Sequence, residues 1–257
     1  MALIRTDPFS QAPIYIKLLF NDTELATGTG FLYKFRDKSF LVSNWHNYSG
    51  RNRETKQPLS AHGGLPNSVA CYLFKKADFI QRTWIVFPLA KENEFYWLEH
   101  PNRDLEIDIG ILPIMMPPET RPIHINDLPM TEIAPEVSHD VFILGYPFPP
   151  ASIHGLPIWK RGSIASEPGG SSNFFYVDTA SRPGMSGAPV LTRYRGFYKT
   201  DPTSQAMNDN DWFGEGTDFI GIYSGRIGAE DALQLGRVWK KRLIEEIIES
   251  STKYVEP

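Results

Sequence analysis

Apolar positions along the chain form short runs that alternate with polar residues and stop at Gly, Pro, Asn or Asp. Such runs, rich in β-branched and aromatic side chains, are typical of β-strands. A proline-rich stretch, Met115–Pro135, separates two sets of these runs and indicates a linker. The predicted strands are Ile14–Phe20, Ala26–Phe35, Ser39–Ser43, Val69–Phe74, Trp84–Leu89 and Ile107–Ile114 before it, and Val141–Gly145, Lys160–Ala165, Phe174–Asp178, Ala188–Thr192 and Phe219–Tyr223 after it.

Helical periodicity is rare until the last part of the chain. Between Ala229 and Glu249, apolar residues recur at helical spacing with charged residues between them, which predicts one amphipathic helix. Its apolar face packs on its own protein or docks a partner. Many short strands without alternating helices favour sandwiches or closed barrels over a doubly wound fold. Two polar segments, Gly50–Asn67 and Arg193–Thr217, are predicted to be surface loops.

Composition and charge exclude several classes of protein. The 257 residues are 41% hydrophobic and 22% charged, which is typical of a globular chain. The formal net charge of −4 gives no overall attraction to nucleic acid or anionic lipid, so neither is expected as a partner. The longest stretch without a charged residue, Val141–Trp159, holds four prolines, so no membrane span is expected.

Cys71 is the only cysteine of the sequence, and an intrachain disulfide is therefore impossible. Its apolar surroundings predict that it fills the core of a strand. The first residues lack the basic start and apolar run of a secretory signal. Together these features predict a cytoplasmic protein.

The candidate nucleophile is Ser186, within the segment Arg182–Pro189. Gly184 and Gly187 flank it and free the backbone to form a turn in which N–H groups converge beside the hydroxyl. An esterase elbow has a second Gly at the position that Ala188 occupies here, which argues against an α/β-hydrolase. A tight turn without catalytic function is the alternative.

A serine nucleophile needs a neutral imidazole as base and a carboxylate to orient that imidazole. His46 lies at the end of an apolar strand, and Asp108 lies where a carboxylate enters an otherwise apolar strand. A charge in that position is costly unless it is paired. Asp104 and Glu106 are the rival carboxylates. The remaining histidines lack metal-ligand spacing, and neither a metal nor a cofactor is expected.

The order His46, Asp108, Ser186, together with the segments Gly28–Leu32 and Pro183–Pro189, resembles the trypsin-like serine peptidases. The disulfide-free, HtrA-like bacterial branch is the most similar in appearance. Further matches are Val141–Pro147, Gly162–Ser166, Phe175–Thr179 and Phe219–Gly225, so that the resemblance spans Leu25 to Arg226.

The resemblance implies an all-β fold of two perpendicular, six-stranded antiparallel β-barrels with the active site between them, followed by a C-terminal α-helix. Residues 1–118 would form the first barrel and carry His46 and Asp108, and residues 119–228 would form the second and carry Ser186. Residues 229–257 would be the helix and tail.

The resemblance also implies a role for each residue of the site. Ser186 would attack the scissile carbonyl and form an acyl-enzyme, His46 would act as base and then acid, and Asp108 would orient His46. The N–H groups of Gly184 and Ser186 would form the oxyanion hole.

Substrate selection is implied by a second group of residues. Ala180 would lie at the base of the primary pocket, where the lack of charge disfavours cleavage after basic residues. Ser224, Gly225 and Arg226 would line the pocket and pair with a protein or peptide substrate as an added strand. Arg226 either points to solvent or closes the pocket and favours a small or acidic side chain.

Two residues depart from the family pattern. Met185 replaces the Asp that pairs with a newly cut N-terminus in many secreted members, so that mode of activation is not available. Trp45 is larger than the usual residue before the catalytic His and is predicted to crowd the cleft.

The main hypothesis is a serine endopeptidase that is latent until a partner protein binds, restrained by Arg193–Thr217 or by a misplaced oxyanion turn. The alternative is a silent pseudoprotease that only binds peptides or signals.

Overall fold

The computed structural model describes residues 6–60, 63–78, 81–92, 94–150, 155–180, 182–199, 201, 203–209, 211–226 and 234–255. Its strands form two antiparallel, six-stranded units. The first unit holds β1 (Pro13–Phe20), β2 (Thr23–Phe35), β3 (Lys38–Ser43), β4 (Ser68–Phe74), β5 (Arg82–Pro88) and β8 (Gly110–Ile114). The second holds β9 (Asp140–Gly145), β10 (Ile158–Ile164), β11 (Phe174–Asp178), β12 (Pro189–Tyr198), β13 (Trp212–Arg226) and β14 (Leu235–Lys240).

The remaining elements are short. A two-stranded ribbon joins β6 (Ala90–Lys91) and β7 (Glu94–Phe95). The helices are α1 (Trp45–Ser49) and α2 (Arg242–Ser250), and single 3-10 turns are η1 (Pro8–Gln11), η2 (Arg103–Leu105) and η3 (Ile125–Asp127). No helix among the described residues combines the length and the hydropathy that a bilayer crossing needs.

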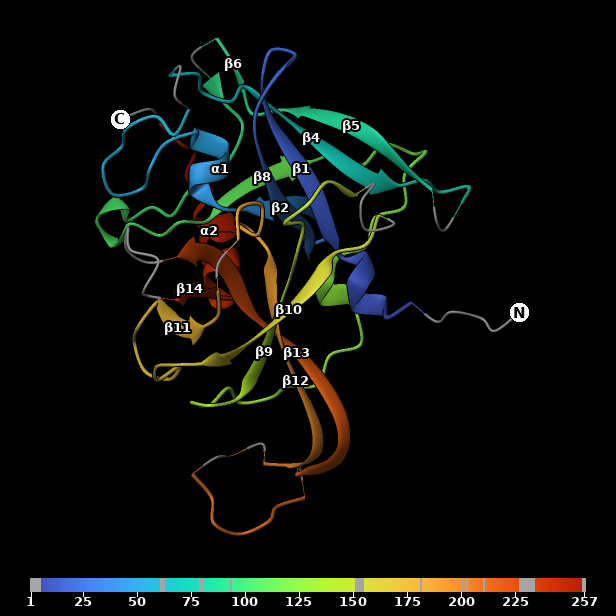
Figure 1. Cartoon of the computed structure of the whole chain (residues 1–257), viewed down its shortest axis with the longest axis vertical. Helices are drawn as coiled ribbons and strands as arrows, with labels where there is room; N and C mark the ends of the chain where they lie inside the picture. The colour runs from blue at the N-terminus through green and yellow to red at the C-terminus, as the bar shows by residue number, and fades with distance from the viewer. Residues whose placement is uncertain are drawn as a thin grey trace.

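The predicted fold class, all-β with two six-stranded antiparallel units and a C-terminal helix, is confirmed. The pairing in the second unit closes a barrel in the order β10-β11-β14-β13-β12-β9. In the first unit the order is β5-β4-β1-β2-β3-β8, and the described residues give no pairing that joins β5 to β8. The two units lie one above the other in Figure 1, with α2 beside their junction.

One buried cluster joins the two units. Phe31 of β2 meets Phe219 of β13 edge to face, with ring centroids 5.3 Å apart. Leu243 and Ile247 of α2 belong to the same cluster and are fully buried. Because apolar burial is the main favourable term in packing, this shared core fixes the two units against each other. A site with residues from both units therefore has a rigid base.

The predicted C-terminal helix is wrong over Leu235–Lys240, which forms strand β14 and pairs with β11 and β13. Gly236 and Val238 alternate with less buried positions, which is a strand pattern. A Cβ on Gly236 would lie 2.4 Å from Tyr223 Cε2, so the Tyr223 ring of β13 packs directly against Gly236 of β14. The helix is confined to Arg242–Ser250, and its apolar face is buried in its own protein.

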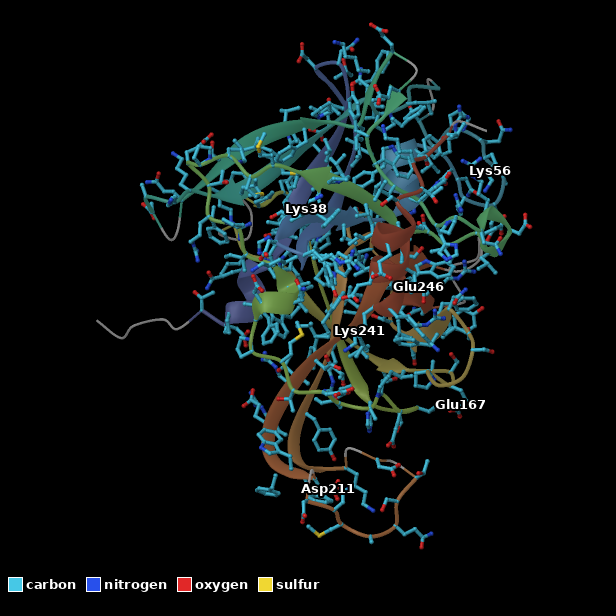
Figure 2. All side chains as sticks on the ribbon, turned by 180° about the vertical axis from the view of Figure 1, so that it is seen from behind. Lys38, Lys56, Glu167, Asp211, Lys241 and Glu246 are labelled. Carbon is cyan, nitrogen blue, oxygen red and sulfur yellow. The ribbon has the colours of Figure 1, made fainter. Side chains whose placement is uncertain are left out.

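The predicted loop Arg193–Thr217 is instead a long hairpin. Strands β12 and β13 continue to pair from Thr192 opposite Asp218 to Tyr198 opposite Trp212. Figure 1 shows this hairpin, which we call the β12–β13 arm, extending away from the barrel, and Figure 2 places Asp211 near its far end. Polarity misled the prediction, because a ribbon exposed on both faces needs no apolar side.

Candidate active site

His46 and Asp108 are brought together by the register of two strands. Strand β3 pairs with β8 so that Ser43 lies opposite Gly110. The antiparallel segments beyond this pair lie side by side, with His46 on α1 and Asp108 just before β8. Asn44 fixes the junction because its Nδ2 donates to Asp108 O at 2.8 Å.

The Asp108 carboxylate is buried and accepts three hydrogen bonds. Oδ1 accepts from the backbone N–H of His46 at 2.9 Å. Oδ2 lies 2.7 Å from His46 Nδ1 and accepts from Ser224 Oγ at 2.5 Å. Since an ionised carboxylate only accepts, the proton of a neutral His46 ring is on Nδ1. The lone pair on Nε2 is then available to take a proton.

Burial and pairing shift the pKa of Asp108, and the pKa of His46, in opposite directions. Burial raises the pKa of Asp108, but the His46 charge and the hydrogen bonds from His46 and Ser224 bring it below its ordinary value. Burial lowers the pKa of His46, but the Asp108 charge and hydrogen bond outweigh burial and leave it above its ordinary value. The carboxylate thus stays ionised at neutral pH and stabilises a protonated His46 ring.

Ser186 lies in a tight turn between β11 and β12 that depends on two glycines. Gly184 has φ +85° and Gly187 has φ +84°, a region that residues with a Cβ rarely adopt. A Cβ on Gly184 would lie 2.3 Å from Tyr146 O, and one on Gly187 would lie 2.1 Å from Thr29 O. Both glycines are therefore required by conformation and by space.

Thr29 of β2 anchors the Ser186 turn to the first unit. Its N–H donates to Ser186 O at 2.9 Å, and its Oγ1 donates to Gly184 O at 2.8 Å. The same Oγ1 accepts from Tyr146 N at 3.0 Å. Asn47 Nδ2, one residue after His46 in the chain, also donates to Ser186 O, at 3.3 Å. The backbone of the candidate nucleophile is thereby held against the segment that carries the base.

The hydroxyl of Ser186 is not hydrogen-bonded to the His46 ring within the described part of the chain. Its Oγ lies 3.5 Å from the point that a Cβ on Gly225 would occupy. The structure thus joins His46 directly to Asp108. The Ser186 backbone is held near this pair by its bonds to Thr29 and Asn47.

The residues predicted to bind substrate lie around β13. Ala180 is half-buried just beyond β11. The register of β13 with β14 shifts before Arg226, which leaves Ser224 and Gly225 in a bulge. The Ser224 hydroxyl is engaged with Asp108, a positioning contact that the sequence did not predict. The side chain of Arg226 lies outside the described part of the structure.

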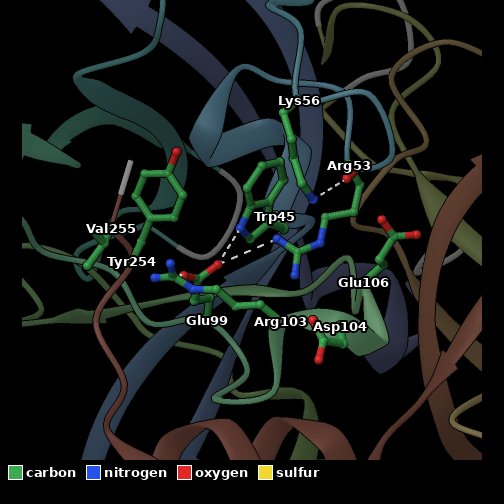
Figure 3. Close-up of a pocket in the computed structure, with 9 residues that line it drawn as sticks. All are labelled: Trp45, Arg53, Lys56, Glu99, Arg103, Asp104, Glu106, Tyr254 and Val255. Carbon is green, nitrogen blue, oxygen red and sulfur yellow. Dashed lines mark hydrogen bonds and ion pairs between the residues drawn. The ribbon is translucent and has the colours of Figure 1, made fainter. Parts of the chain in front are cut away.

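The prediction that Trp45 crowds the cleft is wrong. Its side chain is fully buried on the far side of α1 and meets Trp97 and Tyr254 at ring centroid distances of 6.3 and 5.7 Å. Its Nε1 donates to Glu99 Oε2 at 2.7 Å (Figure 3). Consecutive residues of a helical turn point in different directions, so Trp45 packs against Trp97 and Tyr254 while His46 bonds Asp108.

Met185 is also fully buried, in the core of the second barrel with Val190. Apolar packing therefore holds the turn at the position where the resemblance implies an Asp in other members. The rivals of Asp108 lie elsewhere, since Asp104 is exposed and Glu106 is half-buried in a left-handed turn.

Thr29 and Asn47 are the residues of the site that sequence reasoning missed, and Ser224 was predicted to line the substrate pocket but not to bond Asp108. Thr29 had one signal, since a polar side chain between Gly28 and Gly30 in an apolar strand needs a partner. The Asn47 and Ser224 contacts depend on how the two units dock, which local pattern does not specify.

Comparisons with known proteins agree with this geometry. The family described as "Trypsin-like peptidase domain" matches residues 28–196. A search of curated proteins found no match. Among solved structures, a serine endoprotease from Yersinia pestis has a TM-score of 0.50 and 13% identity, covering 96% of this chain and 67% of that one. The Rv3671c protease from M. tuberculosis, in its active form, has a TM-score of 0.50 and 16% identity, covering 97% of this chain and 84% of that one.

Both structural neighbours share the fold at low identity, and the family match covers most of the chain, including His46, Asp108 and Ser186. The chain belongs to the trypsin-like peptidase domain family and is a hydrolase of the serine protease type.

Proposed function

We propose that the protein is a serine endopeptidase with the triad His46, Asp108 and Ser186. The observation that carries the proposal is the doubly bonded His46–Asp108 pair beside the Ser186 turn. Ser186 Oγ attacks the carbonyl carbon of a peptide bond and passes its proton to His46 Nε2. His46 then protonates the leaving amine, which breaks the C–N bond and leaves an ester on Ser186.

Hydrolysis of this ester completes the cycle. Water attacks the ester carbon, gives a proton to His46 and releases the acid when His46 returns that proton to Ser186 Oγ. In both steps the N–H groups of Gly184 and Ser186 donate to the oxyanion. Asp108 stabilises the imidazolium that forms in each transition state. These steps use protein groups and water alone.

The substrate that we propose is a protein or peptide with a small, apolar or acidic residue before the cleaved bond. Ala180 supplies no negative charge to pair with Lys or Arg. The bulge at Ser224 and Gly225 supports pairing of an extended peptide with this edge. A peptide library with Lys, Arg, Ala, Leu and Glu at the residue before the cleaved bond tests this preference. Preferred cleavage after Lys or Arg would contradict it.

We further propose that the resting enzyme is latent and that a partner protein activates it. The lack of a hydrogen bond between Ser186 Oγ and the His46 ring among the described residues supports this form. The β12–β13 arm extends away from α1, so the restraint lies in the Ser186 turn and not in coverage by the arm (Figure 1). Purified protein is expected to cleave casein slowly; rapid cleavage without a partner would contradict latency.

The test of the triad is labelling by a fluorophosphonate probe, which reacts with an activated serine. Labelling is expected at Ser186 and is lost in Ser186→Ala. The matched control is Ser172→Ala, because Ser172 is exposed and bonds only the nearby Phe174 backbone. Labelling that survives in Ser186→Ala would refute the assignment. A folded wild type that neither labels nor cleaves, but binds peptides, would favour the alternative of a silent pseudoprotease.

A further inference from the structure

A second serine, histidine and aspartate are hydrogen-bonded in a row on the first unit. Ser39 Oγ lies 2.9 Å from His124 Nε2, and His124 Nδ1 lies 3.2 Å from Asp127 Oδ2. We call these three residues the Ser39 cluster. Ser39 lies near the start of β3, next to Lys38 in Figure 2, whereas His46 follows the other end of that strand. The proposed triad uses none of the three residues.

Contacts with β2 hold His124 beside β3. The side chain of Asn126, in η3, accepts from Lys34 N at 2.9 Å and donates to Lys34 O at 2.8 Å, which ties η3 to β2. His124 also forms an isolated parallel bridge with Leu32 of β2. Because Lys34 is the register partner of Ser39 on β3, these ties place the imidazole beside the Ser39 hydroxyl. The contact is therefore fixed by the way η3 docks on the sheet.

The partners of the His124 ring decide where its proton lies. An ionised Asp127 carboxylate only accepts, so the proton of a neutral ring is on Nδ1. Nε2 then carries the lone pair, and the Ser39 hydroxyl donates to it. Burial lowers the pKa of His124 below its ordinary value, so the ring is neutral at neutral pH. This is the arrangement in which a histidine takes the proton of a serine nucleophile.

The surroundings of Ser39 limit what it can attack. Its backbone is paired with Lys34 on β2 and with Ile114 on β8, so the exposed part of this partly exposed residue is its side chain. The same pairing engages the Ser39 N–H in the sheet, where it cannot donate to an oxyanion. Hydrolysis of a peptide bond and phosphonylation by a fluorophosphonate both build charge on an oxygen that such donors stabilise, so neither is expected at Ser39. Acyl donors with a good leaving group remain.

We propose that Ser39 is a second base-activated serine, which accepts an acyl group from an activated ester such as an aryl ester or a thioester. Ser39 Oγ bonds the carbonyl carbon and gives its proton to His124 Nε2. The bond from that carbon to the leaving oxygen or sulfur breaks, the phenolate or thiolate departs with the electron pair, and His124 returns the proton to it or to water. The acyl group stays on Ser39 as an ester, because the engaged N–H cannot assist its hydrolysis.

The experiment measures acetylation of full-length Ser186→Ala protein by p-nitrophenyl acetate, with each modified residue identified by peptide mass spectrometry. The proposed triad cannot react in this variant, so failure at Ser39 leaves the proposed endopeptidase untouched. Ser172 is the reference, because it is exposed and, among the described residues, its hydroxyl bonds only the Phe174 backbone. A general base is worth roughly 10²–10⁴ in rate, so we expect Ser39 to react about a hundredfold faster than Ser172.

Two further measurements identify the product and the donor. Hydroxylamine is expected to remove the acetyl group from Ser39, because it cleaves an ester and leaves an acetylated amine such as that of Lys38 intact. The thioester S-acetyl-N-acetylcysteamine is the second probe. Faster modification of Ser39 than of Ser172 by either donor supports the site, and the ratio of the two rates shows which leaving group is preferred.

Variants connect the reactivity to the Ser39 cluster. His124→Gln removes the base and should slow acetylation of Ser39 about a hundredfold. Asp127→Asn changes an exposed side chain, keeps the test valid if His124→Gln does not fold, and should slow the reaction about tenfold. The control is His139→Gln, because His139 also lies three residues from a carboxylate but beside the second barrel. Equal rates at Ser39 and Ser172, or an unchanged rate in both cluster variants, would overturn the proposal.

Discussion

Replacement of Thr29 by Val tests whether the first unit holds the Ser186 turn in place. The change keeps the side-chain shape and removes only the hydroxyl, which is fully buried. Gly184 O then loses its donor and Tyr146 N loses its acceptor. The first of these bonds fixes the peptide between Gly184 and Met185, which lies between the two proposed oxyanion donors.

The size of the effect follows from these two bonds. A buried polar group left without a partner costs about 1–3 kcal/mol, so two such groups predict a loss of about 2–6 kcal/mol in the free energy of unfolding. Loss of one oxyanion donor costs about 10²–10³ in rate. Because Thr29→Val displaces the turn without deleting a donor, we expect labelling of Ser186 by a fluorophosphonate to slow by roughly tenfold to a hundredfold.

Thr192→Val is the matched control. Thr192 is equally buried, and its Oγ1 donates to a single backbone oxygen, Asp140 O, at 3.1 Å on the second barrel. The Thr192→Val variant is expected to lose about 1–3 kcal/mol in the free energy of unfolding and to keep the wild-type rate of labelling at Ser186. Urea unfolding measures the first quantity and timed probe labelling the second, below the unfolding transition of both variants. Equal labelling rates in Thr29→Val and Thr192→Val would refute the anchoring role of Thr29.

Four further tests address the contacts of His46, Asp108 and Ser186. The raised pKa of His46 predicts that labelling is lost as pH falls through a value above the ordinary 6.5 or so of histidine, because the base must be neutral. Asp108→Asn removes the charge that raises the pKa of His46, so burial of the ring dominates and NMR should find a lower His46 pKa. The rate of labelling should fall by about 10⁴. An unchanged His46 pKa would contradict the pairing of His46 with Asp108. Ser224→Ala removes one of three donors to Asp108 and should slow labelling about tenfold, whereas a wild-type rate would assign Ser224 no positioning role. Gly184→Ala should abolish labelling, because the new Cβ would clash with Tyr146 O. The control is Gly170→Ala, which also has a positive φ but has open space around the new Cβ. It should cost only about 1–2 kcal/mol of stability, measured by urea unfolding.

Local pattern predicted most strands because each has a buried face. β1, β3, β4 and β11 lie within two residues of the predicted bounds. The burial of Cys71 in β4 is also confirmed. The pattern failed where burial is set by distant partners. β14 has helix-like spacing in the sequence, but its place between β11 and β13 makes it a strand.

In the candidate site, too, local sequence pattern predicted some features, and others depend on tertiary packing. A catalytic residue type at the end of an apolar run is visible in the sequence, and both His46 and Asp108 were recognised in this way. The register of β3 with β8, which delivers one to the other, is a tertiary property. Thr29 and Ser224 act across the junction of the two units, where no spacing in the sequence relates them to Ser186 or Asp108.

The junction between the two units is where the proposed latency would be relieved. His46 is fixed by α1 and by Asp108, both in the first unit. Ser186 belongs to the second unit, and its backbone is tied to the first by Thr29 N–H and Asn47 Nδ2. The Ser186 hydroxyl therefore approaches His46 only as closely as these ties and the packing of Met185 allow. Under the proposed latency, a partner that shifts the turn slightly against α1 would let Ser186 Oγ bond His46 without rebuilding either unit, because His46 is already paired with Asp108.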